Sequence, residues 1–281
     1  MSERYTLQNI VDYYDDSFGF YERFMDRHDH RMMHMGYFDE DNDTPGDSVV
    51  NLVRRTVDAI DVGPDDVVLD AGCGIGGPAT WIAKNRGAEV IGININDTQI
   101  EQAEELAVER GVEDLVEFRQ DDFTELDRVD DGEVTAFVSF EALCYATDKR
   151  DVLEQAARVL EDGGRLSVAD GYETQPASSE DPDMRKWLDG WKVDALAHVD
   201  KFTDDLSDLG FRSVEAHDIT DNVLPGSKIM YKKSRRYGPL VKAGSKLGVY
   251  SSNEVGHIVA GRYQYETLDD LWGYFIVTGE R

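Results

Sequence analysis

A glycine-dense turn is the feature of this sequence best suited to holding a ligand. Residues 70–77 read DAGCGIGG and follow an apolar run that begins at Val67. Glycines let the backbone approach a ligand closely, and the N-terminus of a following helix favours a polar or anionic group. The glycine order departs from the dinucleotide fingerprint, and residues 91–94 (IGIN) end without the carboxylate that binds a ribose diol. No Gly-Lys-Ser/Thr sequence follows, which excludes a P-loop.

A second segment with reactive side chains lies further along the chain. Residues 139–145 read SFEALCY and contain the carboxylate Glu141 and the phenol Tyr145. The segment follows a predicted strand, at the edge where doubly wound sheets bind ligands. Both side chains are candidates to face a bound molecule. The alternatives are that Glu141 is a capping or surface carboxylate and that Tyr145 only packs.

Histidines near the N-terminus raise the question of a metal site. His28, Asp29, His30 and His34 lie close together, and the last two histidines are spaced to share one face of a helix. No second carboxylate or cysteine set accompanies them, so no metal is predicted.

The elements that must position these residues follow an alternating pattern. The expected strands are Val67–Ala71, Val90–Ile95, Val116–Arg119, Val134–Phe140, Arg165–Ala169, Phe211–His217 and Tyr274–Gly279. The expected helices are Pro78–Arg86, Asp97–Arg110 and Lys149–Leu160, the last closed by Gly163 and Gly164. This alternation predicts an α/β, Rossmann-like fold with a doubly wound sheet of seven strands.

Two segments fall outside that sheet. The first is residues 1–45, rich in Tyr, Phe, Met and His, and the second is residues 221–271, with helical patterns at Ser227–Leu247 and Asn253–Asp270. An insertion of that length between two strands is expected to be structured and functional. We therefore predict a core at 46–220 completed by a final strand at 272–281, with two helical lid segments over a substrate pocket.

The charge balance limits the partners of the chain. The 281 residues contain 58 acidic and 29 basic side chains, for a net charge of −29. An acidic excess suits a salt-rich cytoplasm, where salt screens the repulsion; the alternative is an ordinary acidic enzyme. The charge argues against nucleic acid as a partner. No long apolar run or signal peptide is recognised, so a cytoplasmic protein without a transmembrane segment is expected.

Basic residues are concentrated in the second lid segment. Seven of the 29 lie within about twenty positions: Lys228, Lys232, Lys233, Arg235, Arg236, Lys242 and Lys246. One interpretation is that they bind an anionic acceptor, such as a diphosphate, a carboxylate or a lipid head group. The other is a helix face paired with nearby acids.

Several motifs together resemble a known family. The runs LDAGCGIGGPATWIA, VIGININDTQIEQA and RQDDF are similar to the S-adenosylmethionine-binding motifs of class I methyltransferases. The chain most resembles the branch of sterol, tocopherol and geranyl diphosphate methyltransferases and cyclopropane-fatty-acid synthases, and sarcosine/dimethylglycine N-methyltransferases share much of its layout. The resemblance covers roughly residues 10–220 and is most specific at 67–103 and 134–172.

The resemblance implies roles for individual residues. Asp70, Gly72 and Gly74 line the methionine part of the cofactor, Asn94 and Ile95 meet the ribose and adenine, and Asp122 accepts from the adenine amine. The full implied cofactor set is Tyr14, Asp70, Gly72, Cys73, Gly74, Gly76, Asn94, Ile95, Gln99, Asp122, Phe123 and Ser139. Asn94 replaces the acid that most class I enzymes carry, which predicts somewhat weaker ribose binding.

The acceptor side follows from the same resemblance. Glu141 occupies the position of a catalytic or substrate-orienting acid, and residues 13–15 (YYD) and 34–38 (HMGYF) resemble segments that fold over the cofactor. Tyr14 and His34 are therefore expected to contact cofactor and substrate, the alternative being ordinary packing.

The prediction for function is transfer of the sulfonium methyl to carbon or oxygen of a small hydrophobic or amphipathic acceptor, isoprenoid-, quinone- or lipid-like. The alternatives are N-methylation of a small amine and a non-catalytic S-adenosylmethionine-binding protein. A homodimer is one option for its assembly.

Overall fold

A seven-stranded sheet forms the centre of the molecule. The computed structural model describes residues 4–24, 30–39 and 43–281. The strands are β1 (Val67–Ala71), β2 (Glu89–Asn94), β3 (Val116–Gln120), β4 (Val134–Phe140), β5 (Leu160–Glu173), β6 (Arg212–Asp218) and β7 (Trp272–Glu280). Their order is β3-β2-β1-β4-β5-β7-β6, and β7 alone runs antiparallel to its neighbours β5 and β6. The predicted Rossmann-like sheet of seven strands is confirmed.

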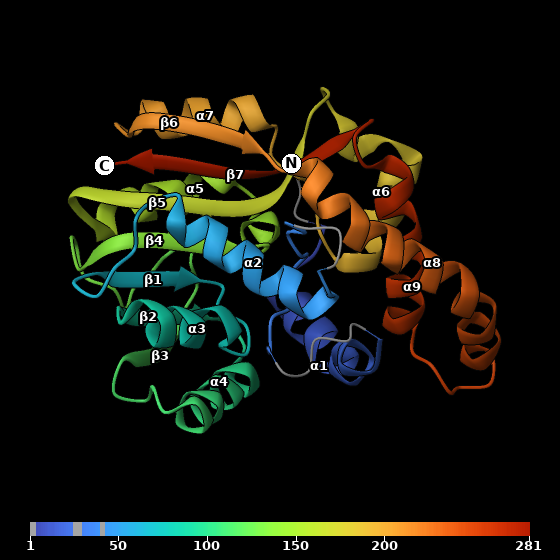
Figure 1. Cartoon of the computed structure of the whole chain (residues 1–281). Coiled ribbons are helices and arrows are strands. Elements are labelled where there is room, and N and C mark those ends of the chain that lie inside the picture. The colour runs from blue at the N-terminus through green and yellow to red at the C-terminus, as the bar shows by residue number, and fades with distance from the viewer. Residues whose placement is uncertain (1–3, 25–29, 40–42) are drawn as a thin grey trace.

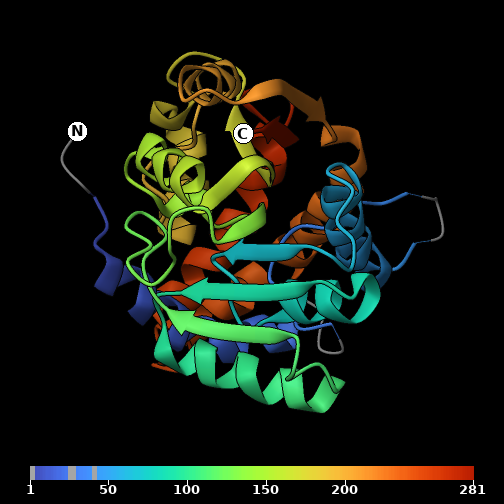
Figure 2. The same ribbon diagram turned by 90° about the vertical axis from the view of Figure 1, so that its left-hand side faces the viewer.

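Helices cover both faces of the sheet because strand side chains alternate between them. On β1, Val68 packs into one apolar core with α2 (Pro45–Asp58) and α3 (Gly77–Arg86). Its neighbour Leu69 packs into the other core with α5 (Lys149–Val159) and α7 (Val199–Asp208). The sheet runs from β3 and α4 (Asp97–Arg110) at one end to β6 and α7 at the other (Figure 1, Figure 2).

The remaining helices gather beyond the carboxyl ends of the parallel strands (Figure 1). They are α1 (Leu7–Phe24), α6 (Pro182–Trp191), α8 (Thr220–Ser245) and α9 (Ser252–Thr267), with short 3₁₀ turns at Leu143–Tyr145 and Ser178–Glu180. Helix α9 packs against α1, α6 and α8. These helices therefore cover the edge of the sheet where the parallel strands end.

Two sequence predictions about elements were wrong. Gly163 and Gly164 do not close a helix, because the chain passes directly from Val159 into β5, and both glycines lie within that strand near a shift in its register with β4. Strand β5 is also longer than predicted, since antiparallel pairing with β7 extends it to Glu173.

The second lid segment contains the two predicted helices with shifted bounds. Helix α8 begins at Thr220, earlier than expected, and neither Pro225 nor Pro239 ends it. Helices α6 and α7 were not predicted at all. Within the described residues, no helix has the length and apolar character needed to cross a bilayer.

Candidate active site

A cavity of about 270 Å³, here called the outer cavity, lies where β1, β2 and β4 end. It brings together twelve of the fifteen predicted site residues: Tyr14, His34, Gly72, Cys73, Gly74, Asn94, Ile95, Gln99, Asp122, Phe123, Glu141 and Tyr145. These residues come from α1, from the segment before α2, from the ends of four parallel strands with the turns that follow them, and from the first turn of α4. The topology therefore explains why residues so far apart in the sequence converge.

The glycine turn forms the floor of the outer cavity. Gly72 and Gly74 have positive φ angles of 84° and 54°, a region that favours glycine. A Cβ on Gly72 would come within 2.2 Å of the Cβ of Ala142, and one on Gly74 within 3.0 Å of Met33 Cε. The amides of Gly72 and Cys73 both donate to the carbonyl of Ile93, which fixes the turn against β2. Glycine at these two positions thus lets the turn pack closely against Ala142 and Met33, and it leaves bare backbone along the cavity.

Amide side chains shape the next part of the wall. Asn94, at the end of β2, donates from Nδ2 to the carbonyl of Gly74 at 3.1 Å and to Gln99 Oε1 at 2.8 Å. Asn96 caps α4 by accepting from the amide of Gln99. Asp122 accepts from the amide and hydroxyl of Thr124 through one carboxylate oxygen. A carboxylate and an amide at neighbouring strand ends suit the hydroxyls and amine of an adenosine.

Three predicted residues do not line the cavity. Ser139 donates to the carbonyl of Ala71 and so links β4 to β1. Gly76 is the N-cap of α3, where a Cβ would come within 2.8 Å of Ala103. Asp70 is fully buried behind the glycine turn, and burial raises the pKa of its carboxyl to about 7, opposed only by the Ala79 amide. Ser139 and Gly76 thus support the wall from behind, whereas both carboxylate oxygens of Asp70 are buried without a hydrogen-bond partner among the described residues.

A smaller cavity of about 50 Å³, here called the inner cavity, adjoins the outer one. Tyr14, Met33, Glu141 and Tyr145 line both cavities and so form the boundary between them. Tyr14 donates from its hydroxyl to the Tyr145 hydroxyl at 3.0 Å, and Tyr145 donates to the Trp191 carbonyl at 3.2 Å. Desolvation raises the pKa of Tyr14, which keeps its hydroxyl protonated.

Glu141 lies at that boundary in a constrained backbone position. Its φ of 52° is in the left-handed region, unusual for a residue other than glycine and costing about 1–3 kcal/mol. The carboxylate accepts hydrogen bonds from the Met35 amide and, at 2.8 Å, from the Tyr274 hydroxyl, while its own amide donates to Ala169. These bonds aim the carboxylate at the junction of the two cavities.

Asp170 is a second acid of the inner cavity, which the sequence analysis missed. It follows Ala169 on β5 and is buried, with its two oxygens accepting from the amides of Cys144 and Gly171. Burial first, and then the charge of Glu141, raise its pKa to about 7. The sequence offered a signal, since Asp170 interrupts an apolar strand run that is buried on both sides.

The remaining inner wall is aromatic. It contains Trp187 and Trp191 of α6 and Trp272 and Tyr274 of β7, with Met35 and Gln264 beside them. The rings of Trp187 and Trp272 lie 4.3 Å apart.

His34 lines the outer cavity, where it stacks on Phe140 and its Nδ1 lies 2.7 Å from the Met35 carbonyl. The expectation that His30 and His34 share a helical face was wrong, because residues 30–39 contain no helix. No group of side chains able to hold a metal occurs among the described residues, and His28 and Asp29 lie outside them.

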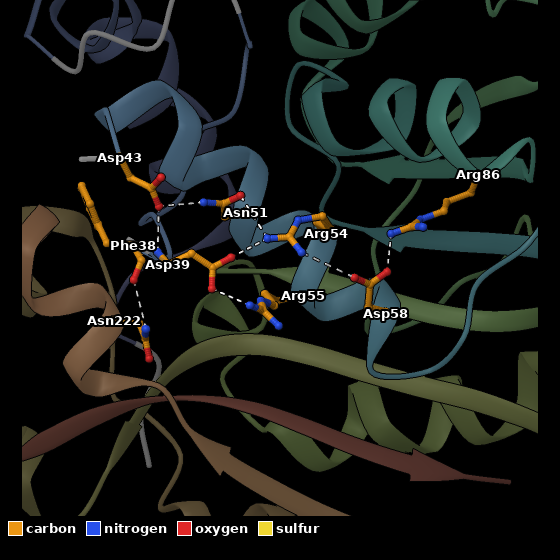
Figure 3. Close-up of polar contacts among 9 residues, drawn as sticks. All are labelled: Phe38, Asp39, Asp43, Asn51, Arg54, Arg55, Asp58, Arg86 and Asn222. Atoms are coloured by element: carbon orange, nitrogen blue, oxygen red, sulfur yellow. Dashed lines mark hydrogen bonds and ion pairs between the residues drawn. The ribbon is translucent and has the colours of Figure 1, made fainter. Parts of the chain in front are cut away.

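A polar network fixes the segment that carries His34 (Figure 3). Asp39 pairs with Arg54 and Arg55 of α2, and although burial alone raises the pKa of Asp39, these two arginines hold it below its usual value. Phe38 exchanges two hydrogen bonds with Asn222 at the start of α8. The segment is therefore tied to both α2 and the second lid.

Comparison with known proteins identifies the class. A methyltransferase-domain model matches residues 69–168. The 27-O-demethylrifamycin SV methyltransferase of Amycolatopsis mediterranei is 31% identical over 250 residues, 89% of each chain. The sterol 24-C-methyltransferase of Saccharomyces cerevisiae is 33% identical over 163 residues, 56% of this chain but only 42% of that one. The sarcosine/dimethylglycine N-methyltransferase of Halorhodospira halochloris is 29% identical over 74% of each chain.

A solved structure agrees in fold. The [4+2]-cyclase SpnF superposes with a TM-score of 0.81 at 20% identity, covering 98% of this chain and 96% of the other. The chain belongs to the S-adenosylmethionine-dependent methyltransferases, and S-adenosylmethionine is its cofactor. The outer cavity fits this cofactor, because its floor is bare glycine backbone and its wall carries the Asn94 amide and the Asp122 carboxylate.

Proposed function

We propose that this enzyme methylates carbon or oxygen of a small hydrophobic or amphipathic acceptor, isoprenoid-, quinone- or lipid-like. The observation that supports this most is the inner cavity, whose walls are tryptophan, tyrosine and methionine around two carboxyl groups. Such walls favour an apolar group and exclude water. The rifamycin and sterol enzymes named above transfer methyl groups to oxygen or carbon, which agrees with this proposal.

The size of the inner cavity limits what enters it. About 50 Å³ accommodates the reacting end of an acceptor rather than a long chain. The same aromatic faces and acids also suit a small ammonium group, because ring faces and carboxylates attract cations. N-methylation of a small amine is therefore the second candidate, and the H. halochloris relative carries that activity in its name.

The residues of the chain supply alignment and proton handling. S-adenosylmethionine, when bound, supplies an activated methyl group. We propose that Tyr14, Asn94 and Asp122 hold it in the outer cavity, and that Tyr145 orients the acceptor at the boundary. Methylation at carbon or at a hydroxyl releases a proton, and Glu141 is placed to accept it. Asp170, with a pKa of about 7, lies in the same cavity and can share that proton.

The acceptor class is tested by measuring S-adenosylhomocysteine release. The enzyme is given the organic-soluble and the water-soluble fractions of a salt-adapted cell extract separately, in molar KCl, with Glu141→Gln as the matched control. Release with the organic fraction supports the hydrophobic acceptor. Release only with the aqueous fraction contradicts it and supports the small amine, and release that Glu141→Gln leaves unchanged contradicts the role of Glu141.

We also propose that the enzyme works in a salt-rich cytoplasm. The support is the net charge of −29, whose self-repulsion molar salt screens. The free energy of unfolding is expected to rise from 0.1 to 2 M KCl in urea titrations. Equal stability at both concentrations contradicts this proposal.

A further inference from the structure

Except at Lys233, which has an interaction partner, the basic cluster has neither of the partners that its sequence suggested. None of its seven residues lines the outer or the inner cavity. Among the described residues, six of the seven make no ion pair: Lys228, Lys232, Arg235, Arg236, Lys242 and Lys246. All six are exposed to solvent. Neither the cavities nor an ion pair within the described residues therefore accounts for these six cations.

The six side chains share one face of the hairpin formed by α8 and α9. Lys228, Lys232, Arg235 and Arg236 are spaced by one helical turn, and Lys242 and Lys246 continue the same face. The opposite face, with Val223 and Val241, is buried. The cations thus form a continuous stripe along the outer side of the helix.

Exposed apolar side chains accompany this stripe. Six large apolar residues of the described chain are exposed, and four of them lie in this region: Leu224, Leu240, Leu247 and Val249. Leu247 is 81% exposed and Val249 66%, and both lie in the connection between α8 and α9. That connection is at the outer end of the hairpin, remote from the sheet (Figure 1).

The local charge is unlike that of the rest of the chain. No aspartate or glutamate occurs from Asn222 to Asn253, although the whole chain has 58 in 281 residues. The rest of the chain contains the other 22 basic residues together with all 58 acidic ones. An anionic partner is therefore repelled by most of this molecule and attracted at this one region.

We propose that this basic and apolar tip, residues 228–249, docks the enzyme on an anionic lipid surface. Lysine and arginine stems beside exposed leucine and valine are the composition of interfacial membrane contacts, with the cations at the head groups and the apolar groups inserted between them. An acidic patch on a partner protein would pair with the cations but would not require the apolar Leu247 and Val249 at the outer end of the hairpin. The proposal does not depend on which acceptor the enzyme methylates.

Vesicle flotation tests it without cofactor or acceptor. The vesicles are phosphatidylcholine alone or mixed equally with phosphatidylglycerol, at the lowest KCl concentration at which circular dichroism stays native. The wild type is expected to bind the mixed vesicles and not the phosphatidylcholine ones. Lys242→Gln with Lys246→Gln is expected to weaken binding by about 25-fold, since each cation near such a surface contributes roughly fivefold.

Two further double substitutions distinguish the contribution of charge to vesicle binding from that of apolar contact. Leu247→Ser with Val249→Ser is expected to weaken binding roughly tenfold, whereas exposed Val108→Ser on α4 leaves it unchanged. Lys84→Gln with Arg128→Gln removes the same charge elsewhere on the surface and also leaves it unchanged.

Three results of the flotation assay overturn the proposal. They are absent binding to the mixed vesicles, equal binding to both vesicle types, and equal loss with Lys84→Gln and Arg128→Gln. A dimer of the vesicle-free protein that Lys242→Gln with Lys246→Gln disperses in sedimentation velocity also overturns it, because the tip then binds a second copy. None of these results bears on S-adenosylhomocysteine release, which tests the enzyme's own activity.

Discussion

Replacing Asp170 by asparagine is expected to change how stability depends on pH. Burial beside Glu141 raises the pKa of Asp170 to about 7 in the folded protein, against about 4 in an unfolded chain. At a pH between these two pKa values, the Asp170 carboxyl is deprotonated in the unfolded chain and protonated in the folded protein. The free energy of unfolding therefore falls as pH rises. Linkage gives a loss of about 3 kcal/mol between pH 5 and pH 9 from this one group.

Asparagine removes that titration and leaves the shape of the side chain almost unchanged. It forfeits one of the two backbone hydrogen bonds, a cost of about 1–2 kcal/mol that does not vary with pH. Asp70 and His257 also titrate with shifted pKa values, near 7 and 3, but they are present in both proteins and their effects cancel.

The assay is urea unfolding followed by tryptophan fluorescence in molar KCl at pH 5, 7 and 9. Between pH 5 and pH 9, the free energy of unfolding of Asp170→Asn is expected to fall by about 3 kcal/mol less than that of the wild type. The control Asp65→Asn, at an exposed position, is expected to behave as the wild type. The same pH dependence in Asp170→Asn and the wild type would refute the assignment of a raised pKa to this carboxyl.

Two further predictions concern the boundary between the cavities. Glu141→Gln is expected to lower kcat by about 10²–10³-fold and to leave S-adenosylhomocysteine affinity within about threefold, because it removes a proton acceptor and keeps a side chain of similar size at the cavity boundary. Steady-state kinetics and calorimetry check this, and an unchanged kcat contradicts it. Tyr14→Phe is expected to lower the free energy of unfolding by about 1 kcal/mol, because the Tyr145 hydroxyl no longer receives a hydrogen bond from Tyr14. Urea titration measures this change, and an unchanged free energy of unfolding contradicts the prediction.

The cofactor half of the site could be predicted from the sequence because its geometry is local. Gly72, Asn94 and Asp122 lie at the end of a parallel strand or in the turn that follows it, and parallel strands place those ends at one edge of the sheet. Gly72, Asn94 and Asp122 therefore converge without any knowledge of side-chain packing. Asp70 differs, because it lies before the last residue of β1 and is buried behind the turn.

The inner cavity could not be predicted in the same way. Trp187 and Trp191 lie on α6, and the packing of α6 against α9 brings them to the sheet edge, next to Tyr274 of β7. A signal for α6 was nevertheless present. Asp181 caps the helix, Pro182 follows at its first position, and apolar residues recur at helical spacing from Met184 to Trp191.

The most direct test of the central claim is calorimetric titration with S-adenosylhomocysteine in molar KCl. The wild type is expected to bind one equivalent, and Asp122→Ala to bind about tenfold more weakly because a carboxylate hydrogen bond is lost. Exposed Glu125→Ala, three residues further along, is expected to bind as the wild type. Absent binding to the wild type, or equal affinity in Asp122→Ala, would contradict the claim that the outer cavity holds the cofactor.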